Sequence, residues 1–217
     1  MPIFEPTSRS KVRRLAERAS YDSDEIYPIL DASLVCHVAF VVEGQPFVIP
    51  TLHARIGDTI LLHGSPGSRL IRHLQAGNEV SISVALVDGL VAAKSVFHHS
   101  INYRSAVVFG RGRKIEGQEE LLKGLEAFVE KILPGRWSEA RLPNSDELRT
   151  TGMAAVDIVS ASAKSRSGPP VDDPADLDLP VWNGQIPLRQ AAGPLLGDSA
   201  LPVSPSVEAL LKLLQRD

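Results

Sequence analysis

A run of short, apolar, β-branched segments separated by tight turns constrains the fold of this chain more than any other feature. Six such segments follow one another, at 34–42, 47–55, 59–63, 79–87, 91–98 and 102–115. In the fourth segment Val80, Ile82, Val84 and Leu86 alternate with other residues, as in a strand that buries one face. One predicted helix, at about 68–76, interrupts the series. Closely spaced strands with tight turns favour a small antiparallel barrel over an α/β sandwich.

Helical periodicity flanks these strands. We expect helices at 11–19, 22–32, 117–133, from 144 and from 205, and one more strand at 153–161. The predicted fold is therefore mainly β with added helices. Residues 1–164 are predicted to form the main domain, and residues 165–217 a C-terminal extension. The extension is rich in Pro, Gly and Asp, yet it carries Trp182 and Leu195, which need the barrel or a partner to cover them.

Composition excludes several classes of protein. The chain has 217 residues, a net charge of −3, and 43% hydrophobic and 23% charged residues, as in an ordinary soluble domain rather than a dedicated nucleic-acid binder. Its single cysteine, Cys36, excludes an internal disulfide and fits a reducing compartment. Since the sequence shows neither a membrane-spanning apolar run nor a signal peptide, we expect a cytoplasmic protein. The six histidines form no metal-ligand motif, so no metal site is predicted.

The stretch 60–70 places an apolar strand, a turn of small residues and a helix start in succession. Gly64, Ser65 and Ser68 leave backbone N–H groups accessible and add two hydroxyls, and Arg69 adds a fixed positive charge. Such a set of donors suits a phosphate group. The segment matches neither the Walker pattern nor the Gly-x-Gly-x-x-Gly pattern. By itself, therefore, it predicts either a phosphate site or a simple connection.

Four segments together resemble the FMN-binding split-barrel proteins of the pyridoxamine 5′-phosphate oxidase-like family, in particular its nitroimidazole-reductase-like, flavin-nucleotide-binding group. The segments are GQPFVIPT at 44–51, LHGSPGSR at 62–69, FHHSINYRS at 97–105 with VVFG at 107–110, and SAKSR at 162–166 with WNG at 182–184. The resemblance implies a split antiparallel β-barrel with flanking helices. It also implies a homodimer with FMN at the subunit interface.

The resemblance also implies which residues contact the cofactor. Beside the isoalloxazine it places Ile49, Pro50, Thr51 and Leu52. At the ribityl-phosphate end it places Leu62, His63, Gly64, Ser65, Ser68 and Arg69. Further cofactor contacts are expected from Asn102, Tyr103, Arg104 and Ser105, and from Trp182 of the extension. His99 and Tyr103 are the candidate proton donors for catalysis.

The expected function is that of an oxidoreductase that uses bound FMN to reduce a small acceptor of nitro or quinone type, with NADH or NADPH as reductant. In true pyridoxamine 5′-phosphate oxidases an arginine-rich stretch follows the tail tryptophan. After Trp182 this chain offers only Arg189 in that stretch, so vitamin B6 oxidation is not expected. Two alternatives stay open. One is a non-catalytic flavin-binding sensor or carrier, and the other is a haem-binding protein with His63, His98 or His99 as axial ligand.

Overall fold

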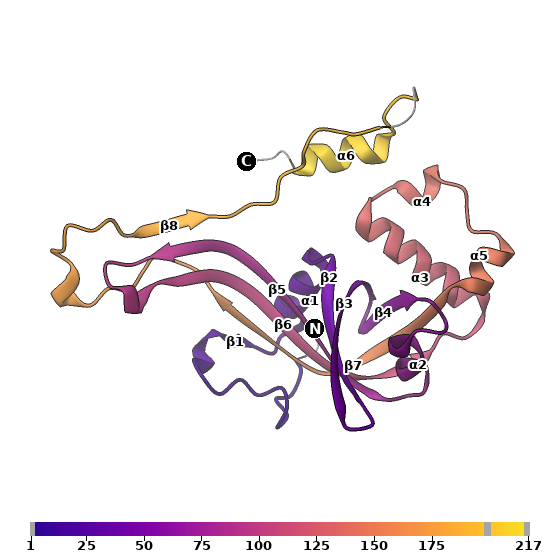
Figure 1. Ribbon diagram of the computed structural model, residues 1–217, viewed down its shortest axis with the longest axis horizontal. Helices are drawn as coiled ribbons and strands as arrows, with labels where there is room; N and C mark the ends of the chain where they lie inside the picture. Colours follow the sequence, from indigo (N-terminus) through magenta and orange to yellow (C-terminus); the bar gives the residue numbers. More distant parts are fainter. Residues whose placement is uncertain (1–2, 198–200, 215–217) are drawn as a thin grey trace. The chain divides into compact units, whose positions relative to one another are not determined.

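The computed structural model describes residues 3–197 and 201–214 of the chain (Figure 1). Its strands are β1 (Ala19–Ser20), β2 (Val35–Val42), β3 (Gln45–Ile56), β4 (Thr59–Gly64), β5 (Glu79–Ala92), β6 (Ser100–Lys114), β7 (Gly152–Arg166) and β8 (Gly184–Pro187). Its α-helices are α1 (Ser23–Ala32), α2 (Arg69–Gln75), α3 (Gly117–Ile132), α4 (Arg136–Glu139), α5 (Ser145–Thr150) and α6 (Pro205–Leu214). Short 3-10 turns lie at Ala16–Arg18, Val96–His98 and Pro174–Asp176.

The strands are hydrogen-bonded in the order β1-β7-β4-β3-β2-β5-β6, with β8 paired to β5. β7 also pairs with β6, so the series from β7 to β6 is linked at both ends, as in a barrel. The β2–β3, β3–β4 and β4–β7 pairs are antiparallel. The predicted mainly β, antiparallel fold with flanking helices is therefore confirmed. Within the described residues, none of the helices is long and apolar enough to cross a membrane.

Contacts divide the chain into two compact units. The first contains Met1–Ser33, Ser83–Val108 and Ser160–Arg189, and the second contains Leu34–Ile82, Phe109–Val159 and Gln190–Asp217. The long strands β5, β6 and β7 contribute residues to both units. The predicted boundary after residue 164 lies inside β7, and the division into a main domain and an extension stays a prediction.

In the first unit, α1 begins where the sequence predicts it, because the Asp22 side chain caps the helix by accepting the N–H of Asp24 at 2.9 Å. The predicted helix at 11–19 is wrong, since only Ala16–Arg18 forms a 3-10 turn. Leu15, which precedes that turn, has a left-handed backbone (φ 53°) that no α-helix tolerates. The predicted break between the strands at 79–87 and 91–98 is also wrong: β5 continues through Asp88 and Gly89, and Gly89 pairs with Pro187 of β8.

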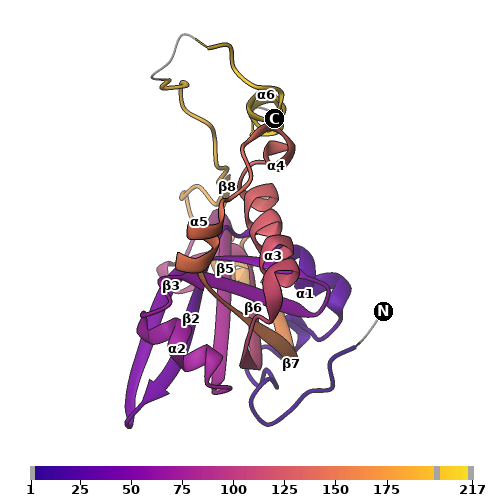
Figure 2. The same cartoon turned by 90° about the vertical axis from the view of Figure 1, so that its right-hand side faces the viewer.

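In the second unit, β2 and β3 form a hairpin around a two-residue turn, Glu43-Gly44, in which both φ angles are positive. Such turns suit the twist of paired strands, which explains why this hairpin is readable from sequence. Helix α3 packs its apolar side on the strands (Figure 2). Phe128 of α3 joins a buried cluster with Leu61 of β4 and Met153 of β7. This packing fixes the end of β4, from which the predicted phosphate turn departs.

Candidate functional site

The predicted phosphate segment folds as expected, as strand β4, a tight turn and helix α2. Ser68 caps α2, because its Oγ accepts the N–H of Ile71 at 3.3 Å. Ser65 Oγ accepts the N–H of Gly67 at 3.4 Å. Each serine hydroxyl therefore holds the turn together as an acceptor and keeps its own O–H to donate.

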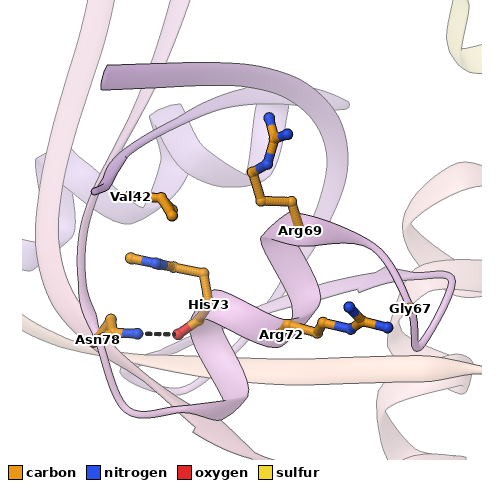
Figure 3. Close-up of a pocket in the computed structure, with 6 residues that line it drawn as sticks. All are labelled: Val42, Gly67, Arg69, Arg72, His73 and Asn78. Carbon is orange, nitrogen blue, oxygen red and sulfur yellow. Dashed lines mark hydrogen bonds between the residues drawn. The ribbon is translucent and has the colours of Figure 1, made fainter. Parts of the chain in front are cut away.

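A cavity of about 550 Å³ lies beside α2 in the second unit (Figure 3). Its walls are formed by Val42, Gly67, Arg69, Arg72, His73 and Asn78. The Arg69 guanidinium lies over the Phe47 ring, 4.2 Å from its centre. Arg72 reaches back toward the turn, within 3.6 Å of where a Cβ on Gly67 would stand. The two side chains extend in different directions and present positive charge at two places on the wall.

These two arginines differ from the other arginines whose ion pairs the structure defines. Arg104, Arg113 and Arg141 each contact a carboxylate at 2.7 Å. Among residues 3–197 and 201–214, no carboxylate pairs with Arg69 or Arg72. The cavity therefore carries uncompensated positive charge, the usual condition for binding an anion.

Sequence reasoning found Arg69 but missed Arg72, His73 and Asn78. The signal was available, because arginines three positions apart on a helix share a face. The contribution of Val42 had no local signal, since the β2–β3 hairpin brings it to α2 from a distant part of the chain.

The predicted isoalloxazine segment, 49–52, lies on β3 in the same unit. Ile49 and Thr51 pair with the fully buried Val38 and Cys36 of β2. The other face of the hairpin is apolar and open: Val41 is 57% and Val48 63% exposed. Pro50 lies exposed on that open face, and Leu52 packs partly against the buried cluster. The segment therefore combines a buried face with an uncovered apolar face.

Leu62 and His63, at the end of β4, point into the unit rather than into the cavity. Leu62 is fully buried, so only its backbone is available to a ligand. The His63 ring packs against Phe128, with 4.4 Å between ring centres. In the described part of the chain its Nδ1 is buried without a hydrogen-bond partner. Burial lowers the pKa of His63, which keeps the ring neutral near neutral pH. Gly64 ends β4 opposite Gly152.

The predicted cofactor contacts on β6 lie in the first unit, where the polar side chains of Asn102, Arg104 and Ser105 already have protein partners. Asn102 donates to the carbonyl of Gly168 at 3.2 Å and to Gln185 Oε1 at 2.8 Å, and its own oxygen accepts from Arg166. Arg104 forms a two-point ion pair with Asp88, at 2.9 and 2.7 Å.

Ser105 Oγ donates to the carbonyl of Lys164 at 3.0 Å, and Tyr103 is half-buried. That these β6 residues contact a cofactor stays a prediction.

The paired histidines lie on a turn, not on a strand. The predicted strand at 91–98 is wrong beyond Ala92, where β5 ends. Ser95 then caps a 3-10 turn by accepting the N–H of Phe97. His98 Nε2 lies 3.2 Å from Asp173 Oδ2, and His99 Nδ1 lies 3.0 Å from the Ser95 carbonyl oxygen.

Trp182 lies in the segment before β8, in the first unit, and is 63% exposed. Its ring covers Gly184, where an added Cβ would come within 2.8 Å of the indole. The flanking residues are held in place: the Val181 carbonyl accepts from Lys94, and Asn183 donates to Asp172 at 2.7 Å. The indole is therefore presented on an anchored segment while most of its surface stays open.

Known proteins share both the sequence pattern and the fold. Residues 22–165 match the family model described as pyridoxamine 5′-phosphate oxidase. Flavocytochrome Anf3 from Azotobacter vinelandii is 34% identical in sequence to this chain. The match covers 94% of this chain and 96% of the Anf3 chain, and the two structures superpose with a TM-score of 0.86. An FAD and haem binding protein from Mycobacterium smegmatis is 33% identical over 88% of this chain and 96% of its own, with a TM-score of 0.83.

A putative 5-nitroimidazole antibiotic resistance protein from Bacteroides thetaiotaomicron is 25% identical over 67% of this chain and 85% of its own, with a TM-score of 0.56. No curated protein matches the chain. The family match covers well over half of the sequence, and the fold agrees with it. The resemblance inferred from four segments is thus confirmed, and the chain belongs to the pyridoxamine 5′-phosphate oxidase family.

Proposed function

We propose that this protein is a flavin-binding oxidoreductase that reduces a small acceptor of nitro or quinone type. The observation that carries the proposal is the cavity beside α2, in which Arg69 and Arg72 face an open volume with no carboxylate partner among the described residues. Similar proteins support it, because one of them is a flavocytochrome and another is an FAD and haem binding protein.

In this proposal Ser65, Ser68 and Arg69 bind the phosphate that follows the ribityl chain. Two hydroxyl donors and one guanidinium fit the oxygens of a phosphate ester. The segment 49–52 lies along the isoalloxazine, and its strand backbone and apolar side chains exclude water from the ring. This FMN portion is common to FMN and FAD. A bound flavin supplies the electron transfer from NADH or NADPH to the acceptor.

The β6 residues and Trp182 remain proposed cofactor contacts. Asn102, Tyr103, Arg104 and Ser105 are the proposed contacts on that strand. Tyr103 and His99 are the proposed proton donors. His99 is exposed and its Nδ1 contacts the Ser95 carbonyl, so the opposite ring nitrogen points to where an acceptor can approach.

A homodimer is part of the proposal. The open face of the β2–β3 hairpin carries Val35, Val41 and Val48, which are 46%, 57% and 63% exposed. Exposed apolar side chains on one face of a strand pair are typical of an interaction site. A second copy of the chain covers this face in the proposed dimer, and the flavin lies at the interface.

Haem binding is a second candidate function, because two of the similar structures are those of a flavocytochrome and of an FAD and haem binding protein. Of the three candidate ligands, His99 has the geometry that suits iron. A ligating histidine commonly donates its second ring N–H to a carbonyl or carboxylate, and Nδ1 of His99 meets the Ser95 carbonyl. Nε2 of His98 instead faces Asp173, and His63 packs against Phe128.

Titration of the protein with flavin tests the first function. We expect the double variant Ser68→Ala/Arg69→Ala to weaken binding at least about tenfold, because each charge-assisted hydrogen bond contributes about 1.5–3 kcal/mol. Arg149→Ala is the matched control, since it removes an exposed arginine of the same unit that pairs with Asp146. Unchanged affinity in a folded double variant would show that the phosphate binds elsewhere.

Titration with haem tests the second function. We expect an iron-porphyrin spectrum that His99→Ala abolishes and His98→Ala retains. If both variants keep the spectrum of the unaltered protein, neither histidine is the ligand.

A further inference from the structure

The segment that leads into β1 gathers positive charge in a chain that is otherwise acidic. Residues 9–18 hold five basic residues and one acidic residue, although the net charge of the whole chain is −3. The segment forms a loop and a 3-10 turn, so its basic residues are not distributed around a helix (Figure 1). A local charge opposite in sign to the rest of the molecule is typical of a surface that attracts an anionic partner.

The loop is held in a defined conformation through its backbone. The N–H of Val12 donates to the Tyr21 hydroxyl at 2.9 Å, and the carbonyl of Arg14 accepts from Lys164 Nζ at 2.8 Å. Leu15 has a left-handed backbone, with φ 53° and ψ 55°. Such a conformation costs free energy at a residue other than glycine and is common at binding sites. The fold therefore maintains this loop against local strain.

Three basic side chains of the loop point to a binding role. Lys11, Arg13 and Arg14 are exposed, and none of them forms an ion pair with a carboxylate of residues 3–197 or 201–214. Arg13 and Arg14 are neighbours in the chain, so their charges repel each other. An acidic surface that binds here relieves this repulsion and is also attracted to the loop over a distance.

Lys164 connects the loop to the proposed flavin site. Its ammonium group donates to the Arg14 carbonyl, and its own backbone carbonyl accepts from Ser105 Oγ at 3.0 Å. Ser105 is one of the proposed flavin contacts on β6. All three residues belong to the first unit. A partner bound at the loop is therefore one residue, Lys164, away from a proposed flavin contact.

From this arrangement we infer that the loop at 9–18 docks an acidic electron-carrier protein that reduces the bound flavin. The inference rests on the proposed flavin binding and adds a reductant of a different class from NADH and NADPH. Small interfaces steered by charge are typical of electron-transfer encounters. A small acidic protein can contact the loop alone. A membrane surface or a nucleic-acid duplex extends past the loop and meets the negative charge of the remaining chain.

The electron balance of this step is simple. Each carrier molecule is oxidised by one electron and then leaves the loop. Two successive encounters deliver the two electrons that full reduction of a flavin requires, and solvent supplies the protons.

Isothermal titration of the flavin-free protein with plant-type [2Fe–2S] ferredoxin, an acidic one-electron carrier, tests the docking surface without the flavin. At low ionic strength we expect Arg13→Gln/Arg14→Gln to weaken binding about fivefold or more, because two exposed charge contacts are lost. Added salt is expected to weaken binding to the unaltered protein. Arg13→Lys/Arg14→Lys keeps the charge and is expected to retain binding.

A matched control removes the same charge elsewhere. Arg149 and Lys212 are also exposed, so Arg149→Gln/Lys212→Gln changes the net charge equally and is expected to alter the affinity less than about twofold. Circular dichroism confirms that each variant is folded. With flavin bound, stopped-flow absorbance measures reduction by reduced ferredoxin, and we expect the same order of rates among the variants.

Ferredoxin binding that is absent, or that is equal in the unaltered protein and in Arg13→Gln/Arg14→Gln, would overturn the inference and leave the proposed flavin binding intact. Binding of duplex DNA or of phosphatidylserine vesicles at Arg13 and Arg14, without ferredoxin binding, would also overturn it, because the partner would belong to another class. A protein that binds no flavin would overturn the proposed function. Ferredoxin binding that depends on Arg13 and Arg14 in that flavin-free protein would still support the docking surface.

Discussion

Two regions of this molecule carry arginines in or next to segments that the sequence marks as cofactor contacts, and they differ in what those arginines already bind. At the start of α2, Arg69 and Arg72 line a cavity and pair with no carboxylate among the described residues. At the start of β6, Arg104 is held by both oxygens of Asp88. The same residue type is available to a ligand in one region and committed to the protein in the other.

The difference shows why residue type alone does not define a binding site. A guanidinium that already forms a two-point ion pair must break it before it can bind a phosphate, and the bonds lost offset most of the bonds gained. An unpaired guanidinium at a cavity wall has only its hydration to lose. From the ion pairs in the folded structure, we therefore expect the α2 arginines to contribute more to phosphate binding than Arg104 of β6.

The double variant Arg69→Ala/Arg72→Ala gives the largest expected effect and tests this ranking directly. We expect it to weaken flavin binding at least about tenfold, since Arg69 loses its charge-assisted contact with the flavin phosphate and Arg72 no longer adds positive charge to the same cavity wall. Arg104→Ala is expected to weaken binding less than Arg69→Ala alone, because its donors are already committed to Asp88. Isothermal titration measures all three affinities. A greater loss from Arg104→Ala than from the double variant would reverse the ranking.

Asn102→Ala is expected to have an intermediate effect, on stability. Asn102 is only 8% exposed and is bonded to Gly168, Gln185 and Arg166. Its removal takes a hydrogen-bond partner from each of these three residues, none of which is itself buried, so the expected cost is about 0.5–1.5 kcal/mol. Urea unfolding measures the change in the free energy of unfolding. Unaltered stability would mean that these groups find other partners, and that the hydrogen bonds of Asn102 contribute little to the stability of the β6 region.

His63 gives the smallest expected effect, a pH dependence of stability. Burial lowers its pKa below the ordinary value of 6.5, so the unfolded chain binds the proton more readily than the folded one. Stability is therefore expected to fall as the pH drops below about 6.5, down to the lower pKa of the folded state. His63→Gln removes this contribution. Equal pH profiles for the two proteins, measured by urea unfolding, would show that His63 titrates normally.

The elements that sequence predicted well are those fixed by local chemistry. The β2–β3 hairpin follows from alternating apolar residues and the Glu43-Gly44 turn, and α1 follows from its Asp22 cap. The continuation of β5 through Gly89 was missed because its partner strand, β8, lies about a hundred residues later.

The candidate site divides in the same way. Arg69 was predictable from the turn that precedes it, because Gly, Ser and Arg side by side are a local pattern. The position of Arg72 at the cavity depends on helix α2, and the position of Val42 depends on the β2–β3 hairpin reaching α2. A cavity depends on which distant segments meet, and short motifs do not record that.

The visible absorption spectrum of the purified protein tests the central claim most directly. After addition of FAD and removal of the unbound excess, we predict a retained flavin spectrum close to one flavin per chain, and its loss in Arg69→Ala/Arg72→Ala. A protein that retains no flavin after the same treatment, while remaining folded, would contradict the account.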